Sequence, residues 1–416
     1  MPTRLSLRLS AALTLLGLVA APALAQTGAG DPLSRFIEEG DIILDARLRF
    51  EFVDRDGFTK DATALTARAR YGFETGALHG FRLLVEGDVT RDLGVNDFNS
   101  TVNGKALFPV VADPDSERLN RLQLSWTGAW DGGASATGTV GRQRIKLDND
   151  RFIGNVGFRQ NEQTYDAARL QVSPLEGLTV DYAYLWQVNR IFGSKSVNDS
   201  AESDSHIIHA TYKTGWADVT GYAYLLDLED SLAGASSQTY GARLVGSRTL
   251  AADWRVLYEA EFARQTDFGG AQADFNLDYI KLRGGAEFGG LTVAAQTEWL
   301  EGDGNRGFAT PLATLHAFQG FADLFLNTPA TGIRDIQVDA SYRWRDVPLL
   351  DKVRLAVWFH DFRSERGGAD LGEEIDWGLF ITPRKGVTFS LKYADFFGAP
   401  GLPDTRRVWA SLDLAF

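Results

Sequence analysis

The chain contains no cysteine, a single methionine and only 12 prolines in 416 residues. Without cysteine the fold cannot depend on disulfides, and cysteine nucleophiles and cysteine-ligated metal sites are excluded. Beyond the N-terminus, no apolar run reaches the ~20 residues that a membrane-spanning helix needs, because charged residues or glycines interrupt each one. A helical membrane protein is therefore excluded. The 43 glycines and 26 phenylalanines suit many strands and turns instead.

The N-terminus has the pattern of a secretory signal peptide. Two arginines precede an apolar run over residues 9–21, and Ala23-Leu24-Ala25 supplies the small residues of a cleavage site. The alternative is an uncleaved anchor helix, but the apolar run is too short to span a membrane. We therefore interpret residues 1–25 as a signal peptide and residues 26–40 as an N-terminal periplasmic segment.

Acidic residues outnumber basic ones by 55 to 42, which gives a formal net charge of −13. Loss of the signal peptide would remove two arginines and no acid, so the mature chain is more acidic still. This balance argues against nucleic acid as a partner. It says less about membranes, because a barrel places its charges in the lumen and the loops.

From Asp41 to the last residue, apolar and polar side chains alternate with a period of two. In the first segment Leu48 and Phe50 fall on one face, whereas Arg47 and Arg49 fall on the other. The pattern recurs in about eighteen segments, each near the ~9–11 residues that a tilted strand needs to cross a bilayer. Helical spacing would scatter these sets around a cylinder, so the alternation predicts strands over residues 41–416.

Short and long connections alternate between these segments. Long polar loops are expected at Asp92–Glu117, Lys146–Glu162, Arg190–Asp204 and Gly302–Gly332, with tight turns between them. Outer-membrane barrels have this asymmetry, because their periplasmic turns are short and their outer loops are long. The fold class predicted is therefore all-β, a transmembrane antiparallel up-and-down β-barrel of about eighteen strands.

The two faces of the strands indicate two environments. Arginines and carboxylates occur together on the polar face, which would be costly in a dry core but suits a wet lumen. Aromatic residues near the strand ends fit girdles at the two interfaces with lipid and lipopolysaccharide. The final residue, Phe416, ends an alternating strand and looks like the signal that the barrel-assembly machinery recognises. We expect a location in the outer membrane.

Strand alternation also directs a set of cations into the lumen. The pore-lining candidates are Arg47, Arg49, Arg68, Arg70, Arg82, Arg142, Arg144, Lys146, Arg343 and Arg345. Guanidinium groups stay charged and hold carboxylates in bidentate pairs, so these residues would favour an anionic solute. The alternative is that lumen carboxylates such as Asp45, Glu51 and Asp88 neutralise them in structural ion pairs.

Residues 141–170 contain a Gly-Arg-Gln strand, an Asp/Asn-rich loop and an Arg-Gln-Asn segment that leads into a further strand. This stretch resembles the signature of the bacterial alginate export family of outer-membrane proteins. The positions that carry the resemblance are Gly141, Arg142, Gln143, Asp148, Arg151, Gly154, Arg159, Asn161, Thr164 and Asp166. The resemblance implies a monomeric barrel that passes an anionic polysaccharide through an arginine-lined constriction, with periplasmic export partners possible.

No catalytic residue, metal site or cofactor is expected. His206 and His209 fall on opposite faces of a strand, so they cannot share a metal ion. A protease-like constellation around His360 and Asp361 is the one enzymatic arrangement left open. We expect a channel for an anionic polysaccharide, oligosaccharide or similar anionic solute. The alternatives are a general or organic-acid porin with little selectivity, and a structural or adhesive barrel whose loops bind partners.

Overall fold

The computed structural model of the chain describes residues 36–345 and 347–416. The predicted signal peptide lies outside the described residues, as does the first part of the predicted periplasmic segment. In the described part of the chain, no helix is both long enough and apolar enough to span a membrane.

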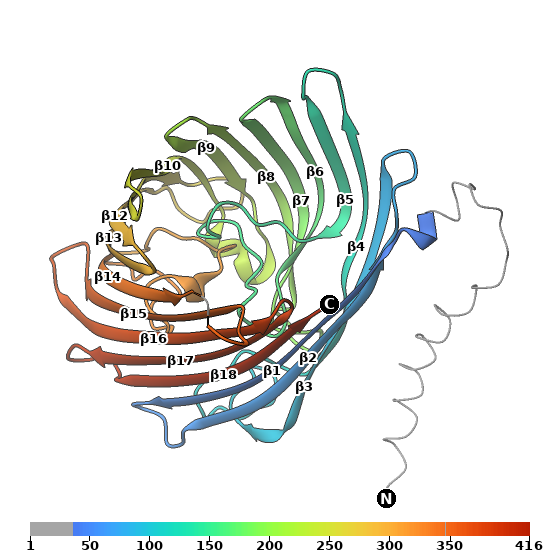
Figure 1. Cartoon of the computed structure of the whole chain (residues 1–416). Coiled ribbons are helices and arrows are strands. Elements are labelled where there is room, and N and C mark those ends of the chain that lie inside the picture. The colour runs from blue at the N-terminus through green and yellow to red at the C-terminus, as the bar shows by residue number, and fades with distance from the viewer. Residues whose placement is uncertain (1–35, 346) are drawn as a thin grey trace, which may run out of the picture.

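Eighteen strands form one closed antiparallel sheet (Figure 1). Each strand pairs with its neighbours in sequence, and closure is completed by β1, which pairs with both β2 and β18. The strands are β1 Asp41–Arg55, β2 Ala62–Glu74, β3 Phe81–Asp97, β4 Ser116–Ala129, β5 Ser135–Gln143, β6 Thr164–Leu175, β7 Leu178–Asn189, β8 Ser200–Lys213, β9 Ala217–Leu226, β10 Ser237–Ala251, β11 Trp254–Thr266, β12 Asn276–Phe288, β13 Leu291–Leu300, β14 Ile333–Trp344, β15 Lys352–Arg363, β16 Asp370–Arg384, β17 Val387–Gly398 and β18 Thr405–Ala415. The predicted up-and-down barrel of about eighteen strands is confirmed.

The two ends of the barrel differ in their connections. At one end the turns are as short as residues 176–177 and 385–386, whereas the other end carries the long loops over residues 144–163 and 301–332. Two short 3-10 helices, η1 Asp230–Ala235 and η2 Leu315–Ala317, lie in the long connections. In membrane barrels of this kind the short-turn end faces the periplasm. We therefore refer to it as the periplasmic end.

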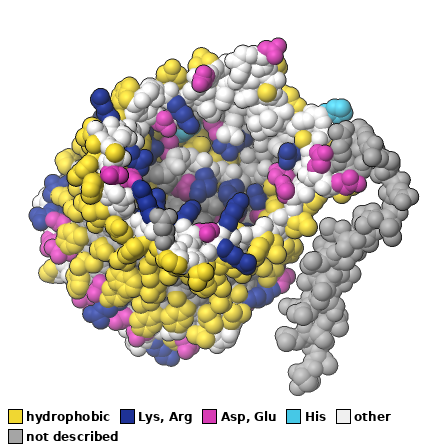
Figure 2. Space-filling view, in the orientation of Figure 1, with side chains coloured by type: hydrophobic (Ala, Val, Ile, Leu, Met, Phe, Trp, Pro, Cys, Tyr) yellow, Lys and Arg dark blue, Asp and Glu magenta, His cyan; other side chains and the backbone are white. Residues whose placement is uncertain are grey.

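The outer wall is apolar and the inner wall carries most of the charge. Leu48 lies opposite Leu412 and Ala67 on the outer face, whereas Arg49 lies opposite Ser411 and Thr66 on the inner face. Large apolar side chains are exposed all round the outer wall, and Figure 2 shows them as a broad apolar surface. A closed barrel leaves no unpaired strand edge, so this wall satisfies its backbone groups within lipid.

Part of the inner wall is apolar, which the sequence pattern did not predict. Phe152, from the loop over residues 144–163, packs its ring 5.2 Å from that of Tyr222 and 5.4 Å from that of Tyr279. Phe308, from the loop over residues 301–332, joins the same cluster. The two long loops therefore share a hydrophobic core with the inner face of the strands, inside the barrel.

Candidate functional site

Two long loops fold into the barrel and narrow it. We name them the first inner loop (residues 144–163, between β5 and β6) and the second inner loop (residues 301–332, between β13 and β14). Ile153 and Leu312 form a parallel bridge between the loops, and the Gly154 N–H donates to the Leu312 carbonyl at 2.8 Å. The two loops are therefore one hydrogen-bonded body across the lumen.

Arginines of β1 and β2 hold the first inner loop in place. One guanidinium nitrogen of Arg47 donates to the carbonyls of Gly157 and Phe158, each at 3.0 Å. Arg49 donates to the same Phe158 carbonyl at 2.5 Å, and its side chain is only 4% exposed. These arginines lie on the inner face, but the loop covers them, so much of their hydrogen-bonding capacity is used by the protein itself.

Carboxylates pair with three arginines of β1 and β2. Arg47 pairs with Asp413 at 2.5 Å, and Arg68 pairs with Asp45. Arg70 lies 3.6 Å from Glu162, a buried residue of the first inner loop that also pairs with Arg144.

The carboxylate of Glu162 is held in its charged form. Burial alone would raise the pKa of Glu162, but Arg70 and Arg144 lower it to about 2. Asn120 and Asn155 donate to the same carboxylate, each at 2.6 Å. This part of the inner wall is therefore an ion-pair network that fixes the loop.

Arg159 is the centre of a second network. Its guanidinium lies 3.0 Å from Glu51 on β1, 3.7 Å from Asp113 and 3.2 Å from Asp323 of the second inner loop. Burial would lower the pKa of Arg159, but the three carboxylates raise it. Arg159 therefore links the barrel wall to both inner loops.

His316 in the second inner loop packs against the same side of the barrel. Its ring stacks on that of Phe158 at 3.4 Å, its Nδ1 lies 2.8 Å from Asp323, and its Nε2 lies 2.7 Å from the Lys392 ammonium. Burial, followed by the Lys392 charge, lowers the pKa of His316 to about 3. The imidazole is therefore neutral at physiological pH, with Nδ1–H donating to Asp323 and Nε2 accepting from Lys392.

Open space remains on the other side of the lumen, against β11 to β15. A cavity of about 250 Å³ lies beside the second inner loop. Its lining residues are Glu259, Lys281, Arg283, Gln296, Ala317, Phe318, Gly320, Phe321, Gln337, Trp358 and His360. A second cavity of about 310 Å³ lies nearer the periplasmic end and shares Arg283 with the first. We name them the upper cavity and the lower cavity.

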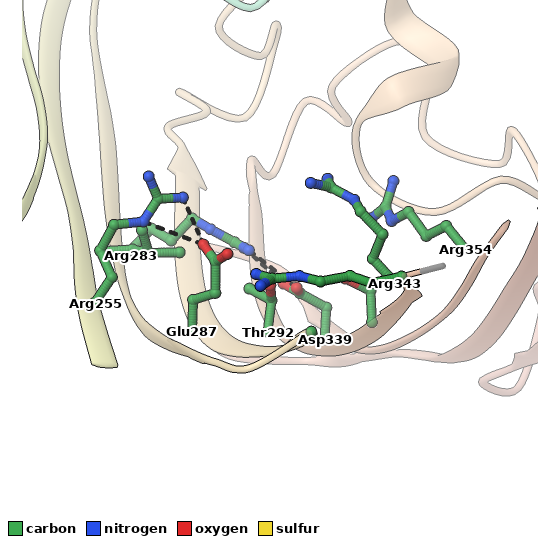
Figure 3. Close-up of a pocket in the computed structure, with 11 residues that line it drawn as sticks. Arg255, Arg283, Glu287, Thr292, Asp339, Arg343 and Arg354 are labelled. Carbon is green, nitrogen blue, oxygen red and sulfur yellow. Dashed lines mark hydrogen bonds and ion pairs between the residues drawn. The ribbon is translucent and has the colours of Figure 1, made fainter. Parts of the chain in front are cut away.

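The lower cavity is rich in arginine (Figure 3). Its lining residues are Arg255, Leu257, Arg283, Glu287, Gly290, Thr292, Asp339, Ser341, Arg343, Arg345 and Arg354. Arg283 pairs with Asp339 at 2.6 Å and Arg255 pairs with Glu287 at 2.5 Å. Five arginines thus face two carboxylates. Figure 2 shows lysine and arginine side chains gathered around the hollow of the barrel.

The predicted pore-lining residues separate into different environments. Arg343 and Arg345 line the lower cavity, whereas the first inner loop covers Arg49 and Arg70. Arg82 is exposed on the inner face of β3. Arg144 reaches the buried Glu162, and Lys146 pairs with Asp150 and stays half exposed. Arginines 47 and 68 are the two already described as paired with carboxylates.

Arg142 does not face the lumen. It lies opposite Leu122 of β4, which is exposed on the outer wall, and pairs with Asp166 at 2.7 Å. The alternation predicted that Arg142 faces the lumen and that Ile145 and Leu147 face outward. This prediction is wrong for all three residues. Ile145 and Leu147 are buried inside the barrel, because the chain leaves the strand after residue 143 and enters the first inner loop.

The motif positions over residues 141–166 serve to build that loop. Gly141 has a φ of +113°, and a Cβ there would lie 2.3 Å from the Leu122 carbonyl oxygen. Asp148 accepts from His209 at 2.9 Å, and Arg151 pairs with Glu298 at 2.8 Å. Within the loop, Gly154 donates to Leu312 and Asn161 accepts from Thr90. At the strand ends that border it, Gln143 donates to Ala167 and the Thr164 carbonyl accepts from Asn189.

The His360 and Asp361 pair does not form a catalytic arrangement. The Nδ1 of His360 lies 3.0 Å from Asp335 on the inner face, whereas Asp361 pairs with Arg363 at 3.2 Å on the other face of the strand. Among the residues that the structure describes, no group of three or more His, Asp or Glu side chains could hold a metal ion.

Sequence reasoning missed four cations that face the open space: Arg255, Lys281, Arg283 and Arg354. Their alternation with apolar neighbours would have placed them inward by the argument used for Arg343. What the alternation could not supply was which inward cations the loops would leave uncovered.

No protein-family model and no curated protein sequence matches the chain. Solved structures from Pseudomonas aeruginosa are similar in fold. OpdL superposes with a TM-score of 0.67 at 15% identity, over 91% of this chain and 99% of that one. OccK9 (OpdG) has a TM-score of 0.68 at 16% identity, over 92% and 100%, and OpdK with vanillate has 0.64 at 15% identity, over 92% and 99%.

These findings overturn the resemblance to the alginate export family. No family model supports it, and Opd and OccK proteins are barrels that match almost end to end. Residues 141–170 form the end of β5, the first inner loop and the start of β6. OpdK is described as an outer membrane protein, and the apolar outer wall of this chain fits the expected outer-membrane location. The chain has the fold of these Pseudomonas outer-membrane barrels.

Proposed function

We propose that the protein is an outer-membrane channel for small anionic organic solutes, carboxylates above all, which cross by facilitated diffusion. The observation that carries this proposal is the charge of the uncovered lumen. Five arginines face two carboxylates in the lower cavity, and the upper cavity, which shares Arg283, adds Lys281 and Glu259, so six cations face three carboxylates in all. The chain as a whole is acidic, so this local excess of positive charge has no counterpart in the composition.

The size of the open space favours small solutes. The cavities of about 250 and 310 Å³ are near the lower limit of ~300 Å³ for sites that take small organic ligands. The two inner loops hold each other and the wall through hydrogen bonds and buried ion pairs, so the constriction is built in rather than a loose segment. This arrangement favours the organic-acid porin over a conduit for polysaccharide and over a barrel whose loops act only outside.

The lining of the upper cavity suits a planar carboxylate. Phe318, Phe321 and Trp358 supply aromatic surface beside Lys281 and Arg283. OpdK, similar in fold, has been crystallised with vanillate, a small aromatic carboxylate. An aromatic ring can stack on the aromatic side chains while its carboxylate pairs with a cation. We also propose that residues 1–25 are removed as a signal peptide, that Phe416 takes part in assembly, and that the barrel acts as a monomer surrounded by lipid and lipopolysaccharide.

Planar-bilayer measurements test the proposal. Reversal potentials under a salt gradient should show anion preference, and sodium benzoate should carry current where uronate oligomers do not. Arg354→Gln, in the lower cavity, should weaken the anion preference. Arg363→Gln, on the same strand but exposed and paired with Asp361, should leave it unchanged. Cation selectivity of the unmodified channel would refute the proposal.

A further inference from the structure

The lower cavity contains two arginines that face each other without a carboxylate between them. Arg343 of β14 lies directly opposite Arg354 of β15 in the strand register. In Figure 3 the two carboxylates of the cavity are joined to Arg255 and Arg283, and no dashed line reaches Arg343 or Arg354. None of the carboxylates in the described part of the chain forms an ion pair with either residue.

The two facing arginines lower the stability of this part of the wall, because their charges repel each other. Like charges directly opposite each other on neighbouring strands destabilise a sheet. Asp339 lines the same cavity, but both of its oxygens accept from Arg283, at 2.6 and 2.9 Å. Glu287 is held by Arg255 at 2.5 Å. The positive charge of Arg343 and Arg354 therefore remains to be balanced by a solute or a counter-ion.

We propose, resting on the channel function above, that the lower cavity is a binding site for small organic dianions, dicarboxylates in particular, at the periplasmic exit of the pore. Each guanidinium can hold one carboxylate through two parallel N–H donors, so two of them on adjacent strands match a solute with an acidic group at each end. The hydroxyls of Thr292 and Ser341 line the same cavity and add donors.

The surroundings of Arg354 support a defined site rather than a loose surface charge. Its guanidinium lies 5.9 Å from the rings of both Trp358 and Phe380, which limits where it can point. Trp358 also lines the upper cavity, and Arg283 lines both cavities. A solute that passes from the upper to the lower cavity therefore meets Arg283 before it reaches the Arg343 and Arg354 pair.

Two probes of equal chain length separate this site from general anion attraction: succinate, a dianion at neutral pH, and butyrate, a monoanion. Each is added on the periplasmic side of a single channel in a planar bilayer, and the concentration that blocks half of the chloride current is measured. Succinate should block at a lower concentration than butyrate. In the double variant Arg343→Gln/Arg354→Gln the half-blocking concentration of succinate should rise by about tenfold or more, and that of butyrate should change little.

Matched variants show whether position or total charge is responsible. Arg82→Gln removes a cation from the inner face near the same end but outside the lower cavity, and should leave the succinate block unchanged. Arg343→Lys/Arg354→Lys keeps the charge but loses the paired donors, so it should bind succinate more weakly than the parent and better than the glutamine variant. Thermal unfolding in detergent confirms that each variant is folded.

The site would be overturned if the ratio of the half-blocking concentrations of succinate and butyrate were the same in the parent channel and in the double glutamine variant. An equal loss in Arg82→Gln would likewise show that only total charge matters. Calorimetric titration of the folded protein in detergent with succinate tests the site without conduction. A channel with no anion preference that still binds succinate at Arg343 and Arg354 would therefore refute the proposed function and leave this site standing.

Discussion

Arginines on β1 and β2 and arginines on β14 and β15 point into the same lumen but have opposite roles. Arg49 is almost fully buried beneath the first inner loop and donates to its Phe158 carbonyl and to the Ser411 hydroxyl. Arg343 is exposed in a cavity and lies opposite another arginine. Strand alternation treats the two as equivalent, because it reports only the face of the wall. The inserted loops decide which arginines hold the protein together and which remain for a solute.

The largest expected effect on stability and conductance comes from loss of a cation that fixes the inner loops to the wall. Arg159→Gln would leave Asp113 buried without its cation, and Glu51 and Asp323 would keep only Arg407. Removal of one partner from a buried ion pair costs about 3–5 kcal/mol. We expect a lower unfolding temperature in detergent and a larger, noisier single-channel conductance, because both inner loops lose their link to the wall.

Arg406→Gln is the matched control for that variant. Arg406 is exposed and pairs with Asp395, and surface pairs of this kind contribute about 0–1 kcal/mol. If the conductance and unfolding temperature of the two variants were alike, Arg159 would not be an anchor of the constriction, and the contrast between the two sides of the lumen would fail.

An intermediate effect is expected when the pH is lowered, because His316 helps to hold the second inner loop in place. The pKa of His316 is lowered to about 3 by burial and by Lys392, whereas an unfolded or released loop has the ordinary value of about 6.5. The released state therefore binds more protons between these values, so the stability of the loop is complete above about pH 6.5 and falls with decreasing pH. At pH 5 the loss is about 2 kcal/mol.

Single-channel recordings between pH 7 and pH 5 check this expectation. Larger fluctuations in conductance should appear as the pH falls, and His316→Gln should weaken the dependence in this interval. Glu162, whose pKa is lowered to about 2, contributes only below its ordinary value of about 4.5, so it does not obscure the effect. A pH response that persists unchanged in His316→Gln would assign it to another group.

The barrel itself could be predicted from the sequence because alternation and turn length are local properties. The first strand begins at Asp41, as expected, and the long loops occur between the predicted strands. The covering of Arg49 could not be predicted, since it depends on Phe158, more than a hundred positions later in the chain. The aromatic cluster around Phe152 could not be predicted for the same reason, because it forms only when both inner loops lie inside the barrel.

The smallest expected effect concerns the arginine whose face was wrongly predicted. Arg142 pairs with Asp166 on the outer-facing side of β5, and Asp166 also accepts from Asn189 at 3.0 Å. Arg142→Gln should therefore cost no more than about 1 kcal/mol, because the carboxylate keeps a donor and remains partly exposed. Its reversal potential in a salt gradient should equal that of the parent channel, unlike that of Arg354→Gln. If Arg142→Gln shifted the reversal potential as much as Arg354→Gln, Arg142 would contribute to the electric field of the lumen. The side of the wall that an arginine faces would then not predict its influence on permeating ions.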